Sequence, residues 1–464
     1  METRLAFLRD EDFIERIGFA ATAIFLLTNG ANVLRSAMPI NNATAIVISM
    51  TLWLIGILLV ILALLPRRHP AWVWAILLGF IFTVLGAAYT QSSNYAPLTH
   101  FSTDNLMIGE YAVDVLEHGQ NPYDWDYTDM LRVNRDTLSF TPFVDTAPQH
   151  RVTYPALPTE ILYLFDRLGL GQGRVVDLTF YLAVLVLLFV GADKRYRPLV
   201  LLPVFALNDY TSSTLFGVGD IVWSALLVAM VLAWRRHRWR AVLFGLAASF
   251  RQQPWFIAPF LLLLIWDEGE TRRDKIRACA LFVGISVLIF VGTNLPFALT
   301  SPQSWLQSVI EPLYAQFSVD GIGLNAVWRF GLVSLNRTFF TVLQTGSYLL
   351  LLLLYWRHRR AWGMAFWIIP IIYFWMYYRS LTNYWLYWIP HCLSPSCPAS
   401  IPVFAPPFAT AAPSSDRERG FRPCARSRRF SPSAAFMFSS SRAQDRASRC
   451  ISVCRCELST GLTL

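Results

Sequence analysis

The chain has 464 residues, of which 55% are hydrophobic and only 15% are charged, and its mean hydropathy is +0.42. This composition excludes an ordinary water-soluble domain and predicts a membrane protein. The net charge is +9, and the chain has two lysines against 37 arginines, an excess of arginine that indicates a GC-rich genome rather than a nucleic-acid partner.

Eleven segments before residue 380 are predicted to cross the membrane. A spanning helix needs about 20 mostly apolar residues, because its backbone polar groups must be satisfied across about 30 Å of hydrocarbon. The clear segments are 17–34, 44–65, 71–90, 174–191, 218–234, 278–297, 338–356 and 362–378. Shorter segments with Pro or polar residues, which we expect to be broken passes packed against protein, are 199–211, 240–251 and 254–266. The predicted fold is therefore an all-α polytopic membrane protein.

Six basic segments predict the orientation in a cell membrane, because Lys and Arg in short loops stay on the cytoplasmic side. They are residues 4–16, 66–70, 193–198, 235–240, 271–277 and 357–361. The predicted spans place all six on one side. The expected parts are therefore N-terminal transmembrane helices (1–90), an extracytoplasmic loop (91–173), a transmembrane bundle (174–390) with a second outer loop (298–336), and a tail (391–464).

The outer loop 91–173 contains two predicted amphipathic helices. The stretch "STDNLMIGEYAVDVLEHG" begins with Ser102 and Thr103, either of which caps a helix well, and it ends at His118 and Gly119. The next residues, "GQNPYD", predict a turn. A second helix from Pro158 to Leu168 is too short to span and is expected to lie at the membrane interface. Together these elements predict a lid over the outer leaflet.

The tail after residue 390 has a different composition, rich in Ser, Pro, Arg, Ala and Cys, and it contains six of the seven cysteines. One interpretation is an arginine-rich segment on acidic lipids, or a metal site at Cys454 and Cys456. A second is a disordered tail. The third, which we favour, is a frameshift near Pro390, because out-of-frame translation of GC-rich DNA gives this mixture of residues.

Motifs in residues 90–388 resemble those of the polytopic glycosyltransferases of the GT-C class, and most closely family 87, the polyprenyl-phosphate-mannose-dependent mannosyltransferases. The matching pieces, in order, are an acidic residue at the start of the outer loop, "GQNPY", "YPAL", "AVLFGLAASFRQQPWFIAPFLLLL", "GTNLPFALTSPQSW" and "DGIGLNAVW". The chain departs from the family at Arg251, where Lys is usual, at Ala156, where a second Pro is usual, and in two additional N-terminal spans.

The resemblance implies a helical body with a cavity open to the outer leaflet. It also implies inverting transfer of a sugar, mannose in that family, from a polyprenyl phosphate to a hydroxyl of a lipid or glycan acceptor in the cell envelope. Such transfer needs a base for the acceptor hydroxyl and positive charge for the departing phosphate. No cofactor is implied, and membrane lipids are the expected surroundings.

Asp104 occupies the acidic position of the family and is the predicted base, with Asp114 as the second choice. Without the resemblance, Asp104 is more simply a helix N-terminal residue favoured by the helix dipole. Asp124, Asp126 and Asp129 are most simply a solvated surface, and a divalent-cation site is the alternative.

Arg251 is predicted to bind the donor phosphate, because a charge at membrane depth suggests function and the guanidinium fork bonds two phosphate oxygens. Its alternative is an arginine that reaches the interface without a ligand. Gln252, His150 and Arg151 are further phosphate-binding candidates. The predicted cavity residues are Tyr154, Asn121, Asp220 and Arg379.

Two other classes of protein compete with a transferase. A secondary transporter or lipid flippase also has broken spans with charges at depth, but the two halves of the chain show no internal repeat. A non-catalytic scaffold leaves Arg251 and the acidic loop without a role. The sequence contains no P-loop, nucleophile elbow or HExxH zinc motif.

Overall fold

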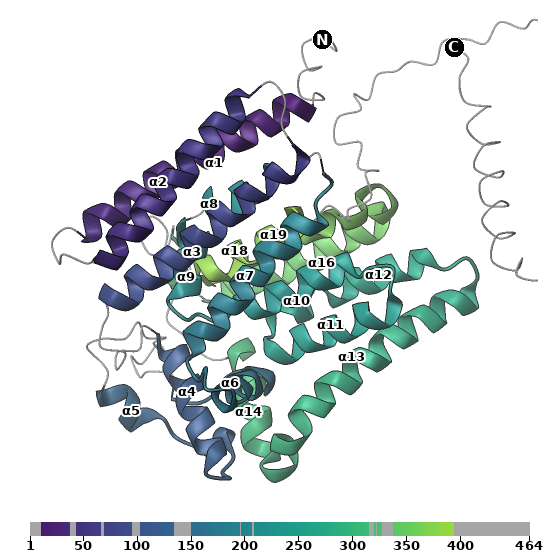
Figure 1. Cartoon of the computed structure of the whole chain (residues 1–464). Coiled ribbons are helices and arrows are strands. Elements are labelled where there is room, and N and C mark those ends of the chain that lie inside the picture. Colours follow the sequence, from purple (N-terminus) through teal and green to yellow (C-terminus); the bar gives the residue numbers. More distant parts are fainter. Residues whose placement is uncertain are drawn as a thin grey trace, which may run out of the picture. The chain divides into compact units, whose positions relative to one another are not determined.

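The computed structural model describes residues 11–37, 43–65, 69–94, 103–133, 150–194, 196–206, 208–314, 320–321, 323–326 and 337–393. Within these ranges the chain is almost entirely helical (Figure 1). Two-residue strands, β1 (Asp320–Gly321) and β2 (Arg379–Ser380), pair in parallel. The predicted all-α class is confirmed, and among the described residues six helical stretches are long and apolar enough to cross a membrane.

The N-terminal helices and the lid occupy the first part of the chain. They are α1 (Glu11–Ala37), α2 (Ala43–Leu64), η3 (Pro70–Val73), α3 (Trp74–Asn94), α4 (Asp104–Glu117), η4 (Pro122–Asp124), α5 (Thr128–Val133) and α6 (Leu157–Arg167).

The remaining helices form the body. They are α7 (Gly173–Gly191), α8 (Leu202–Ala206), α9 (Asn208–Leu215), α10 (Ile221–Leu232), α11 (His237–Phe250), η5 (Gln253–Ile257), α12 (Ala258–Glu268), α13 (Arg272–Thr300), α14 (Pro302–Tyr314), α16 (Arg337–Trp362), η6 (Gly363–Ile368), α17 (Ile369–Trp375), α18 (Thr382–Leu386) and α19 (Ile389–Leu393).

Seven of the eight clear predicted spans coincide, to within three residues at their ends, with parts of the six long apolar stretches, which are 12–34, 43–64, 71–89, 173–191, 272–300 and 338–375. The eighth, 218–234, is the twelve-residue helix α10. Of the short segments, 199–211 is divided between α8 and α9, whereas 240–251 and 254–266 correspond to α11 and to η5 with α12. The count of eleven passes stays a prediction, since helix length supports six.

The stretch 338–375 contains a reversal of the chain. Gly363 has φ +47°, which is left-handed backbone that glycine adopts readily. The rings of Tyr355 and Phe366 lie 5.7 Å apart and those of Tyr348 and Tyr373 lie 5.4 Å apart, so η6 and α17 run back along α16. This reversal lies beside the predicted basic loop 357–361.

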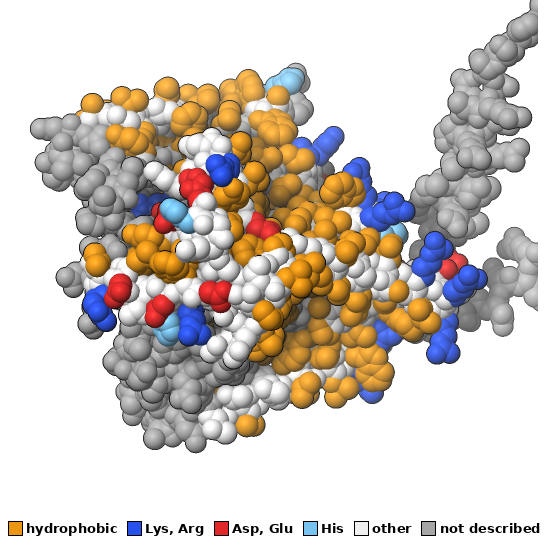
Figure 2. Space-filling model, turned by 90° about the horizontal axis from the view of Figure 1, so that it is seen from below, with side chains coloured by type: hydrophobic (Ala, Val, Ile, Leu, Met, Phe, Trp, Pro, Cys, Tyr) orange, Lys and Arg blue, Asp and Glu red, His pale blue; other side chains and the backbone are white. Residues whose placement is uncertain are grey.

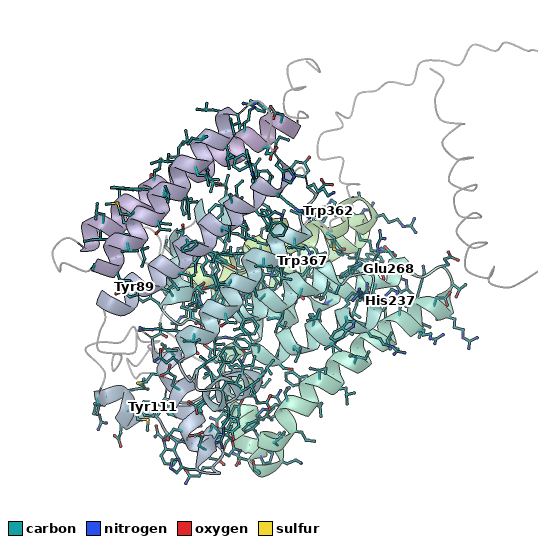
Figure 3. The ribbon with its side chains drawn as sticks, in the orientation of Figure 1. Tyr89, Tyr111, His237, Glu268, Trp362 and Trp367 are labelled. Atoms are coloured by element: carbon teal, nitrogen blue, oxygen red, sulfur yellow. The ribbon has the colours of Figure 1, made fainter. Side chains whose placement is uncertain are left out.

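The described basic segments gather at one end of the bundle. Arg16 donates to the carbonyl oxygens of Ala63 and Leu65, so the start of α1 lies beside the end of α2. Arg240 binds both carboxylate oxygens of Glu268, at 2.8 and 2.9 Å, and Arg359 binds Asp267 at 2.6 Å. Figure 3 shows Glu268 and His237 side by side at this end. In Figure 2, several Lys and Arg side chains gather on the right, and a broad hydrophobic surface separates them from a mixed group of acidic and basic side chains on the left.

Helix α10 explains why a short apolar segment is stable here. Its buried residues lie on all sides of the helix, and Trp223 is fully buried. A helix that is hydrophobic all round is surrounded by protein or lipid. Trp223 packs against Trp388 at 4.8 Å and His391 at 6.3 Å, so the fold includes the chain at least to His391. Residues 394–464, with Cys454 and Cys456, lie outside the described residues.

The lid is a packed body with its own hydrophobic core. Met107, Ala112 and Val115 of α4 pack with Tyr127 and Leu131, and this core joins the end of α13 through Phe297. The predicted helices are confirmed: Thr103 caps α4 by accepting the Leu106 N–H, and the second helix is α6. Figure 1 shows α4, α6 and α14 at the end of the bundle away from the α12–α13 turn.

Candidate functional site

A cleft of about 640 Å³, its open mouth included, lies between the lid and the end of the bundle. Its walls come from α4, α6, the segment before α6, the start of α7, the loop before α10 and the end of α11. The residues that line it include Asn105, Leu106, Arg151, Thr153, Tyr154, Pro158, Leu162, Gly173, Asp177, Gly217, Gly219, Phe250 and Arg251.

The loop "FGVGD" before α10 forms one wall and joins the bundle to the lid. Gly217 and Gly219 have φ +80° and +77°, a conformation that other residues rarely adopt. Thr103 donates to the Gly217 carbonyl, and Asn105 donates to the Val218 carbonyl at 2.8 Å. The two glycines therefore turn the carbonyl groups of this loop toward the start of α4.

Arg251 ends α11 and has only 4% of its surface exposed. Its Nη2 donates to the Val218 carbonyl at 2.6 Å, the same oxygen that Asn105 uses. Its Nε lies 3.3 Å from Asp220 Oδ1, and its guanidinium lies 3.4 Å from the centre of the Tyr154 ring. Three predicted site residues, Arg251, Asp220 and Tyr154, are thus in direct contact.

Asp220 is held as firmly as the arginine that it pairs with. It is 1% exposed, and its two oxygens accept from Trp223 Nε1 at 3.0 Å and from Asn383 Nδ2 at 2.7 Å. A buried carboxylate keeps its charge only with such partners. Asp220 therefore fixes Arg251 at the cleft wall.

Asp177 is a cleft residue that sequence reasoning missed. It lies in the second turn of α7, is 3% exposed, and accepts the Gly219 N–H with Oδ2 at 3.2 Å. The signal was present in the sequence, because Asp177 is the one carboxylate within the predicted span 174–191. An ionisable residue in a span is a functional candidate by default.

Asp104 is the first residue of α4 and is 6% exposed. Its Oδ1 accepts the Asn105 N–H at 2.8 Å. The side chain does not line the described cleft, whereas its neighbour Asn105 does. Asp104 is therefore the sequence neighbour of a cleft-lining residue, Asn105, which contacts Val218. Asp114, the second choice, is exposed on the outer face of α4.

The other phosphate-binding candidates lie differently. Gln252 is buried and donates to the carbonyls of Thr153 and Val309, so its amide holds the lid to α14. Arg151 lines the cleft and donates to Gln307 at 3.2 Å. His150 is half-buried, and its carbonyl accepts the Tyr127 N–H.

Asn121 and Arg379 complete the predicted set. Asn121 caps η4 and donates to the Phe297 carbonyl and the Thr300 hydroxyl, so it anchors the lid to the end of α13. Arg379 is buried in β2, four residues before the Asn383 that binds Asp220.

The acidic residues after η4 lie on the surface of the lid. Asp124, Asp126 and Asp129 are exposed, and Asp126 accepts from the backbone and hydroxyl of Thr128. The Thr128 hydroxyl lowers the pKa of Asp126. In the described part of the chain, no three His, Cys, Asp or Glu residues are grouped as metal ligands.

No protein-family model matches the chain, and no curated protein or solved structure matches it.

Gly219 and Gly119, which both have left-handed backbone, provide a test of the contact between Gly219 and Arg251. A Cβ at Gly219 lies 3.3 Å from Arg251 Nη2, whereas a Cβ at Gly119, with φ +74°, meets nothing within 4 Å. Both Gly→Ala changes incur the left-handed backbone cost of about 1–2 kcal/mol. We expect Gly219→Ala to lower the unfolding temperature more than Gly119→Ala. Equal losses in thermal unfolding of the purified protein contradict a tight Gly219–Arg251 contact.

Glu160 provides a test of the lid. Burial raises the pKa of this carboxyl in α6 to about 7 from 4.5. The folded protein then holds a proton that the unfolded chain releases, so this contribution to stability is complete below about pH 4.5 and is lost as the pH rises through about 7. Between pH 5 and 8, we expect the unfolding temperature of the wild type to fall by about 2–4 °C more than that of Glu160→Gln. Glu117→Gln, at an exposed site on α4, is the control and retains the wild-type slope. Parallel curves for wild type and Glu160→Gln contradict the assignment.

Proposed function

We propose that this protein is a membrane glycosyltransferase of the GT-C type that transfers a sugar, mannose by resemblance, from a polyprenyl phosphate to a hydroxyl of a lipid or glycan acceptor. The observation that carries the proposal is Arg251, a buried cation on the wall of a cleft under a helical lid. A lipid phosphate is a ligand that such a cation fits, because arginine bonds two phosphate oxygens at once.

The proposed reaction uses residues on both sides of the cleft. Asp104 takes the proton of the acceptor hydroxyl, and the acceptor oxygen attacks the anomeric carbon from the face opposite the phosphate. The bond between that carbon and the phosphate oxygen breaks, and its electron pair stays on the phosphate. Arg251 stabilises this charge, with Arg151 as a second cation on the cleft. The sugar is transferred with inversion.

The position of Asp104 is compatible with this role, although the side chain does not line the described cleft. It follows Thr103 and precedes Asn105, both of which bind the 217–218 backbone. The proposed role requires the first turn of α4 to shift when substrate binds, so that the Asp104 carboxylate reaches the cleft that Asn105 lines. Catalytic contacts often become close only when substrate is bound.

The proposed location of the active site is the extracytoplasmic side of a cell membrane. The cleft lies at the end of the bundle opposite the ion pairs Arg240–Glu268 and Arg359–Asp267, and basic loops favour the cytoplasmic side. A donor that is anchored by its lipid chain reaches the cleft from the outer leaflet.

Transfer and transport differ in what happens to a labelled sugar. Purified protein in liposomes receives a polyprenyl phosphate with a radiolabelled sugar and a membrane-lipid extract as acceptor. Label in a new covalent product supports transfer. Label that crosses the bilayer on unchanged donor supports the alternative, a transporter or lipid flippase.

Asp104→Asn tests the proposed base. We expect transfer to fall by about 10²–10⁴-fold, because general-base catalysis contributes about this much. Donor binding is retained, since the amide keeps the shape of the carboxylate. The control is Asp129→Asn, at a side chain that is 93% exposed, which retains wild-type transfer. Wild-type turnover in Asp104→Asn assigns the base to another carboxylate.

A further inference from the structure

We propose that Asp177 binds hydroxyl groups of the sugar that the donor carries, and that it favours a sugar-bearing lipid phosphate over the bare lipid phosphate. This inference rests on the proposed function and adds a residue with a distinct role. Asp177 is separate from the Asp104 position and from the Arg251–Asp220 pair.

The first argument is position. Gly219 lies between Asp177 and Arg251, because its N–H binds Asp177 Oδ2 at 3.2 Å and its Cβ position lies 3.3 Å from Arg251 Nη2. The carboxylate and the guanidinium are therefore one residue apart on the same wall. If Arg251 binds a phosphate, the group attached to that phosphate reaches Asp177. In a glycosyl phosphate that group is the sugar ring.

The second argument is the hydrogen-bonding capacity of the carboxylate. A carboxyl group has two oxygens that form hydrogen bonds, and a buried one needs partners for both. Among the described residues, the bond from Gly219 to Oδ2 is the hydrogen bond that Asp177 makes. Asp177 lines the cleft, so Oδ1 is available to a donor that enters it. Sugar hydroxyls are such donors.

The third argument is the surrounding wall. Leu106, Gly173 and Phe250 line the cleft with Asp177, and a Cβ on Gly173 lies only 2.4 Å from Leu106 Cδ1. Specific pockets combine an apolar lining with a few polar groups that fix orientation. Asp177 is the carboxylate among the described residues of this lining, so it is the group that can recognise the hydroxyls of a sugar on the lipid phosphate.

Asp177 also has a structural role, because it holds the N–H of the left-handed residue Gly219. Asp177→Asn separates the two roles. The amide oxygen still accepts the Gly219 N–H, while an NH₂ group replaces the second oxygen of the carboxyl group. A change that affects sugar recognition alone therefore cannot come from a collapsed loop.

The test measures binding of two probes to the full-length protein in detergent, by titration of tryptophan fluorescence. One probe is polyprenyl-phosphate mannose and the other is polyprenyl phosphate. We expect Asp177→Asn to weaken binding of the sugar-bearing probe by about 2–10-fold, the effect of one hydrogen bond, and to leave the bare probe unchanged. Asp129→Asn, exposed on the lid, is the matched control and binds both probes like the wild type.

Each result has a separate meaning. Wild-type binding of both probes by Asp177→Asn overturns the inference and leaves the proposed function intact. Equal weakening of both probes, or a large fall in unfolding temperature, assigns Asp177 a structural role and also overturns it. Binding of neither probe by the wild type contradicts the proposed function itself.

A competition experiment on the unaltered protein does not depend on how a variant folds. Mannose 1-phosphate and inorganic phosphate each compete with the sugar-bearing probe. We expect mannose 1-phosphate to compete more strongly, because it reaches Arg251 and Asp177 together. Equal competition by the two anions overturns the inference.

Discussion

The structure depends on how a buried arginine is satisfied at one end of a helical bundle. Arg251 has a carboxylate, a backbone carbonyl and an aromatic face around it, which are contributed by Asp220, Val218 and Tyr154. Without these partners a charge at such a site costs several kcal/mol. The three partners come from the loop before α10 and from the lid, so the guanidinium joins parts of the chain that are far apart in sequence.

The same contacts explain why the lid is an ordered part of the fold. Thr103 and Asn105 bind the backbone on which Arg251 also rests, and Gln252 binds the carbonyls of Thr153 and Val309. Ala156 donates its N–H to Asn294 of α13 at 2.9 Å. A proline at this position has no N–H to donate. The Ala156 N–H is thus a specific anchor of the lid.

Much of this architecture follows from the sequence. Hydropathy predicts the long apolar helices, a capping residue predicts the start of α4, and Pro158 predicts the start of α6, because these signals act within a few residues. The contact of Arg251 with Asp220 and Tyr154 joins three predicted residues, but their distances could not be predicted. Asp177 and the pairing of Asn105 with Val218 were missed, because they depend on the left-handed conformations of Gly217 and Gly219. The predicted span 218–234 is longer than the twelve-residue helix α10, because hydropathy does not show that other parts of the protein surround this helix.

The central claim is that the cleft opens away from the cytosol, and the sidedness of single cysteines tests it most directly. Two variants, Asp126→Cys on the lid and Arg238→Cys at the basic end, are exposed sites in a protein whose seven native cysteines are replaced. Intact cells receive a membrane-impermeant maleimide before and after breakage. The account predicts that Cys at position 126 reacts in intact cells and that Cys at position 238 reacts only after breakage. The reverse pattern contradicts it.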